Sequence, residues 1–142
     1  MIGNYSIKIY YTNNDIDSDA YSETSVSSLS GVSNLTINVL TVKMRATNEG
    51  EERQLQGGVI VNYPLMRTEF SFEGVFLLPS DLTLYNTLLT ALKYKNIFIE
   101  KVSLPYSIHT TNYAIKVQCS LEVNPELNRY KFALNCKKEK LN

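Results

Sequence analysis

The residues whose types could support chemistry are few and far apart in the sequence. His109 is the single histidine, and it lies in the loop Ser107 to Asn112 between two predicted strands. No serine or cysteine stands in a sharp glycine-bounded turn of the kind that presents a nucleophile. A Ser-His-Asp or Cys-His arrangement therefore has no recognisable parts, and the sequence predicts no catalytic residue and no enzyme.

The two cysteines, Cys119 and Cys136, fall on the core-facing side of one predicted hairpin. If Val123 faces Tyr130, the sulfurs are diagonal neighbours, whereas a slip of two residues places them opposite each other. The chain begins without an export signal, which favours free thiols over a disulfide. Two cysteines and one histidine also fall short of the four ligands of a structural zinc site.

An acidic loop, residues 15 to 23, resembles the start of an EF-hand calcium loop. Its carboxylates match the first, third, fifth and ninth loop positions. However, Ala20 replaces the glycine of the sharp turn and Val26 replaces the closing bidentate glutamate. The sequence therefore predicts no cofactor and no metal site, and the following carboxylates are the candidate ligands if a cation binds: Asp15, Asp17, Asp19 and Glu23.

Composition predicts one globular domain spanning residues 1 to 142, because a chain of 142 residues can bury a core of its own. The formal net charge of zero argues against a general nucleic-acid or membrane-surface binder, which needs excess lysine and arginine. Apolar residues nowhere run together for the length of a membrane-spanning helix. The first residues, Met1 to Tyr11, also lack the apolar run of a secretory signal.

Alternating apolar and polar residues predict a mainly β fold. The alternation is clear over residues 5–11, 67–78, 113–123 and 130–136, and each of these segments has one apolar face. Over residues 35–44 the alternation changes phase at Val39 and Leu40, which suggests a β-bulge. This pattern is typical of an antiparallel β-sandwich or barrel in the α+β class.

One amphipathic helix is predicted over residues 81–95. Ser80 or Asp81 can cap its start just after Pro79, and Lys93 and Lys95 lie in its last turn. The apolar side chains recur at helical spacing along one third of the circumference, which suits a helix lying on a sheet. They are Leu82, Tyr85, Leu88, Leu89 and Leu92.

Two polar segments interrupt the strands. Residues 12–33 predict a long polar loop or arm, and residues 47–56 predict a shorter polar loop. Each is open to two interpretations: an arm that becomes ordered against a neighbouring subunit, or a solvated loop.

From residue 57 to residue 136, the order of elements resembles that of tail-tube-type and baseplate structural modules of long-tailed bacteriophages. The resemblance is carried by Gly57 to Tyr63, Thr68 to Gly74, the helix Ser80 to Tyr94, and Tyr130 to Leu134. It implies a non-enzymatic structural subunit of a viral tail or baseplate, assembled in the host cytoplasm. Its partners would be further copies of itself or other virion proteins, bound through loops and strand edges.

A β-sandwich ligand-binding module is the alternative. It would bind a carbohydrate or a calcium-assisted ligand through the acidic loop 15–23 and exposed tyrosines such as Tyr10 and Tyr106.

Overall fold

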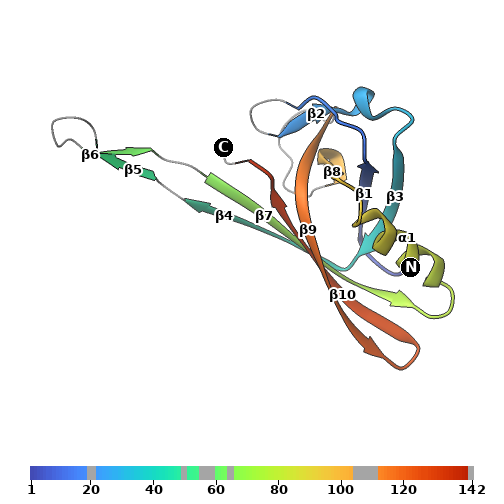
Figure 1. Cartoon of the computed structure of the whole chain (residues 1–142). Coiled ribbons are helices and arrows are strands. Elements are labelled where there is room, and N and C mark those ends of the chain that lie inside the picture. The colour runs from blue at the N-terminus through green and yellow to red at the C-terminus, as the bar shows by residue number, and fades with distance from the viewer. Residues whose placement is uncertain (19–21, 49–50, 55–59, 64–65, 104–111, 141–142) are drawn as a thin grey trace.

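The structure is a computed structural model that describes residues 1–18, 22–48, 51–54, 60–63, 66–103 and 112–140. Among these residues it is mainly β with one α-helix, as the alternation predicts (Figure 1). Its elements are β1 (Tyr5–Thr12), β2 (Glu23–Ser25), the 3-10 helix η1 (Val26–Leu29), β3 (Ser33–Val39), β4 (Thr41–Asn48), β5 (Glu51–Gln54), β6 (Ile60–Tyr63), β7 (Met66–Leu77), α1 (Leu82–Ala91), β8 (Asn96–Glu100), the 3-10 helix η2 (Lys101–Ser103), β9 (Tyr113–Glu126) and β10 (Arg129–Lys138).

An 8-stranded antiparallel sheet forms the body of the protein. Its strands follow the order β3-β1-β8-β9-β10-β7-β4, with β2 paired to β9 beside this path. The two end strands, β3 and β4, are separated in sequence by Leu40 alone, so the sheet must curl until its ends meet. No ladder joins β3 to β7 within the described residues, and the sheet therefore stays open rather than closing as a barrel.

The phase change at Val39 and Leu40 marks this corner rather than the predicted bulge within one strand. The chain pairs with β1 up to Val39 and with β7 from Thr41 onward. The switch of partner strand explains why the apolar alternation restarts there.

The inner face of the curled sheet holds the main core. Phe72, Phe76 and Leu134 are fully buried, and the rings of Phe76 and Phe132 stack with centroids 4.4 Å apart. Helix α1 adds Leu88 and Ala91 to this cluster. The predicted faces of the long strands are therefore confirmed.

Helix α1 is shorter than predicted, because it ends at Ala91 instead of continuing to residue 95. Beyond it the Lys95 N–H donates to Asn13 Oδ1 at 3.0 Å, and the Tyr94 ring contacts Tyr11, so the chain leaves the helical path to start β8. Asp81 occupies the N-cap position, but its carboxylate accepts the Leu77 N–H at 2.8 Å and makes no cap bond to the helix.

Residues 12–33 contain regular structure that the sequence did not predict. Strand β2 pairs with β9, and the 3-10 helix η1 follows it directly. A second cluster forms on the back of the sheet, where Leu29 packs with Tyr10 and Phe98. A few widely spaced apolar residues are enough to pack this segment against the sheet. Much of it is therefore ordered rather than a free loop or arm.

Gly74 provides a direct test of the core. It faces Phe132 across the β7–β10 ladder, and a Cβ added there would lie 2.9 Å from two atoms of the Phe132 ring. Gly74→Ala should therefore destabilise the protein by about 1 to 3 kcal/mol, although such a change usually favours folding by restricting the unfolded chain.

Urea denaturation of Gly74→Ala, Phe132→Leu and the double variant measures this coupling. The loss from Gly74→Ala should shrink in the Phe132→Leu background, because the smaller side chain leaves room for the new methyl group. If the Gly74→Ala protein were as stable as the wild type or more stable, the close contact between Gly74 and the Phe132 ring would be contradicted.

Candidate assembly surface

Strands β4 and β7 run beyond the core and are prolonged by β5 and β6. Thr41 faces Glu73 at one end of this hairpin and Gln54 faces Ile60 at the other, and the two ladders have the same register. Residues 47–48 and 51–54, predicted as part of a polar loop, are thus strand residues. The segment is polar and charged throughout, so it has no apolar face from which a strand could be recognised. We call the hairpin formed by β4–β7 and β5–β6 the arm.

The end of the arm has no third strand. β5 and β6 form a separate 2-stranded sheet in which each pairs only with the other among the described residues. Figure 1 shows this end of the arm far from α1 and from β1 and β3. An isolated two-stranded hairpin is at best marginally stable in water, so this part of the arm is poorly supported by its own chain.

Strand β4 is also an edge of the main sheet. Its only ladder within the described structure is with β7, so the other side of β4 presents unpaired backbone N–H and C=O groups. Lys43 and Arg45 are exposed along it. Charged side chains on an edge strand hinder unspecific strand addition, so a partner must suit them.

The face of the arm that continues the core is partly bare. Met44 lies beside the buried Phe70 but is 45% exposed, and Met66 on the same face is 46% exposed. Apolar side chains continue the core pattern past the point where this chain can cover them. Together, the open edge of β4 and this methionine face form the candidate assembly surface.

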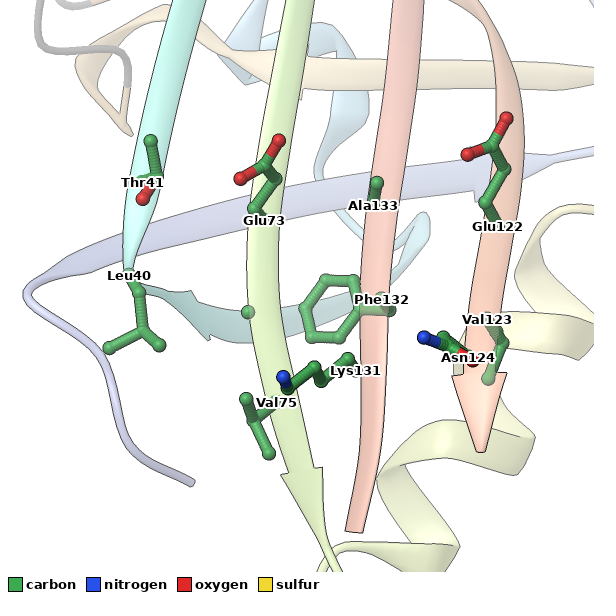
Figure 2. A pocket seen from close by; sticks show the side chains of 11 residues that line it. Leu40, Thr41, Glu73, Val75, Glu122, Val123, Asn124, Lys131, Phe132 and Ala133 are labelled. Carbon is green, nitrogen blue, oxygen red and sulfur yellow. The ribbon is translucent and has the colours of Figure 1, made fainter. Parts of the chain in front are cut away.

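The opposite, outward face of the sheet carries a hollow of about 590 Å³. In Figure 2, Glu73 of β7 and Glu122 of β9 flank Ala133 of β10, with Lys131 one row away. Lys43 pairs with Glu73 at 3.3 Å, but the two side chains are 65% and 45% exposed. Exposed pairs of this kind stabilise little, so the hollow is a solvated charged trough.

The candidate cation ligands do not converge. Asp15 pairs with Lys95 at 2.8 Å, and the hydrogen bond from Lys95 lowers the pKa of Asp15. Asp17 is exposed, whereas Glu23 pairs with Lys101 on another part of the sheet. Asp19 lies outside the described residues, as does His109. In the part of the chain that the structure describes, no three His, Cys, Asp or Glu residues are placed to hold a metal ion.

Tyr10 does not have the exposure that a ligand-binding role requires. It is only 5% exposed within the second cluster, where burial raises its pKa. Tyr106 lies outside the described residues.

A nearly buried charged cluster fixes β2 to the rest of the sheet. Glu23 Oε1 lies 2.6 Å from Lys101 Nζ and 3.8 Å from Lys138 Nζ, and both lysines are under a tenth exposed. Lys138 belongs to β10 and is buried although it lies close to the basic end of the chain. The period-2 pattern of Phe132, Leu134 and Cys136 continues to Lys138 and could have placed it inward.

The cysteines are directly opposite each other, which is the alternative register offset by two residues. Phe132 faces Val123 and Cys136 faces Cys119, because the turn between β9 and β10 comprises only Leu127 and Asn128. Both cysteines are free thiols in this structure.

No protein-family model matches the sequence, and no curated protein matches it. Among solved structures, the chain is similar to one described as "Tail of empty GTA particle computed with helical refinement, C6 symmetry", with 11% identity and a TM-score of 0.42. The match covers 73% of this chain and 80% of the other. A likeness this distant assigns no function to individual residues.

In the described part of the chain, the one α-helix is too short and too polar to cross a membrane.

Glu23 tests the charged cluster. Glu23→Ala removes the carboxylate that the nearly buried ammonium groups of Lys101 and Lys138 share. We expect the free energy of unfolding to fall by about 2 to 3 kcal/mol. Asp15→Ala removes an exposed pair and should cost less than about 0.5 kcal/mol. Chemical denaturation of both variants provides the comparison, and equal losses would show that the Glu23 cluster is not a structural anchor.

Proposed function

We propose that this protein is a non-enzymatic structural subunit of a phage-type tail or baseplate, assembled in the host cytoplasm and retained in the virion. The observation that carries the proposal is the arm, which extends an unpaired edge and an apolar face beyond the core. The order of sequence elements, which resembles that of tail modules, supports the class of assembly.

The energetics of the arm favour a docked state. Met44 and Met66 each leave nearly half of a large apolar side chain in water, next to a core that already buries Phe70. Covering such surface stabilises an interface by roughly 25 cal/mol per Å². A neighbouring subunit that lies on this face would also give the two-stranded end of the arm an element to pack against.

The open edge of β4 offers directional contacts to the same neighbour. A strand added there would pair with backbone groups that have no partner in the described residues. Lys43 and Arg45 would select a partner segment with acidic or neutral side chains, because like charges facing each other across strands are destabilising. We infer that the partners are further copies of this chain or other virion structural proteins.

The alternative, a calcium-assisted ligand-binding module, has less support. The described candidate ligands lie apart, Glu23 is engaged by lysines, and Tyr10 is buried. The outward hollow that Glu73, Glu122 and Lys131 line has room for a small ligand.

Replacing Met44 and Met66 together by aspartate tests the proposal. We expect wild-type protein to show a sedimentation coefficient that rises with concentration, and the double variant to remain monomeric at every concentration. The variant should keep the wild-type circular dichroism spectrum, because both positions are exposed and the core is untouched.

Leu127→Asp is the matched control. Leu127 is 90% exposed at the turn between β9 and β10, so the same chemical change is made outside the arm. This variant should assemble like the wild type. A wild-type protein that stays monomeric alone and with its virion partners, or a double variant that assembles normally, would contradict the proposal.

Calorimetric titration with calcium tests the alternative. Asp17→Ala and wild-type protein should both give no binding heat. A saturable heat that Asp17→Ala abolishes would favour the ligand-binding module.

A further inference from the structure

Cys119 and Cys136 form a preassembled pair of thiols. They face each other on neighbouring antiparallel strands, and their Sγ atoms are 3.2 Å apart. Facing residues in such strands have Cα atoms about 4.5 to 5.5 Å apart, which lies within the range that a disulfide bridges. Closing the bond would therefore need the sulfurs to approach by only about 1 Å, without a change of register.

The two thiols differ in access to solvent. Cys136 is 1% exposed inside the main core, whereas Cys119 is partly exposed at its margin. Burial raises the pKa of Cys136 well above its usual value, so this thiol stays protonated and shielded. A reagent from solvent would meet Cys119 first.

We propose that Cys119 and Cys136 are a modification site, a cross-strand dithiol that low-molecular-weight disulfides such as oxidised glutathione convert into an intramolecular disulfide. The Cys119 thiolate attacks one sulfur of the oxidant and releases one glutathione thiolate. Cys136 then attacks the Cys119 sulfur, and its proton passes to the second glutathione thiolate, which leaves. Two protein thiols are oxidised and one oxidised glutathione is reduced to two thiols.

The bond would lie at the root of the arm. Cys136 is next to Phe70 in the ladder, and Phe70 is next to Met44, so the row Met44–Phe70–Cys136–Cys119 crosses four strands. A disulfide in this row ties β9 to β10 and prevents the hairpin from slipping or opening locally. This role does not depend on the arm having a docking partner.

Equilibrating the full chain with oxidised glutathione and following intact mass is the direct test. The wild type should lose two hydrogen atoms, and its midpoint of thermal unfolding should rise by several degrees. Reduction with dithiothreitol should reverse both changes.

The single variants test the order of attack. Cys136→Ser should accumulate a glutathione adduct on Cys119, and Cys119→Ser should react at least about tenfold more slowly, because its remaining thiol is buried. Cys136→Ala replaces Cys136→Ser if the buried hydroxyl prevents folding. A wild type that keeps both thiols, or a Cys119→Ser variant that takes up glutathione as fast as Cys136→Ser, would overturn the proposal.

Discussion

The single-residue connection at Leu40 is the constraint on which the rest of the structure depends. It joins the two end strands of the sheet, so the sheet has to curl and enclose its aromatic face. The start of the chain lies between β3 and β7. Ile2 forms a β-bridge with Val75, and Gly3 lies so close to the backbone of Val39 that no side chain fits at this position. The curl thereby creates the core and limits how far along the strands that core can reach.

The arm is the consequence of that limit. Once β4 and β7 pass the end of the curl, their inward side chains have no opposing layer, and the apolar pattern continues into solvent at Met44 and Met66. These two methionines are the apolar part of the surface that we propose a neighbouring subunit covers.

The strand faces could be predicted from the sequence because alternation along β7, β9 and β10 reports burial directly. The structure of residues 22–29 could not, because it depends on pairing with β9, which lies far away in the sequence. The arm was not predicted for a related reason. Thr47 and its neighbours are polar on both faces of the strand, so their sequence shows no alternation of apolar and polar residues. The register that places Cys119 opposite Cys136 was left open because it depends on the length of the turn, which the pattern does not define.

Hydrogen exchange measured as a function of protein concentration tests the central claim most directly. Those amides of Thr41–Asn48 that do not donate to β7 should exchange rapidly in dilute protein and slowly in the assembled protein, while amides of β1 and β8, which are paired on both sides, should exchange alike under both conditions. Assembly that leaves the exchange of Thr41–Asn48 unchanged would show that another surface makes the contacts and would contradict the account.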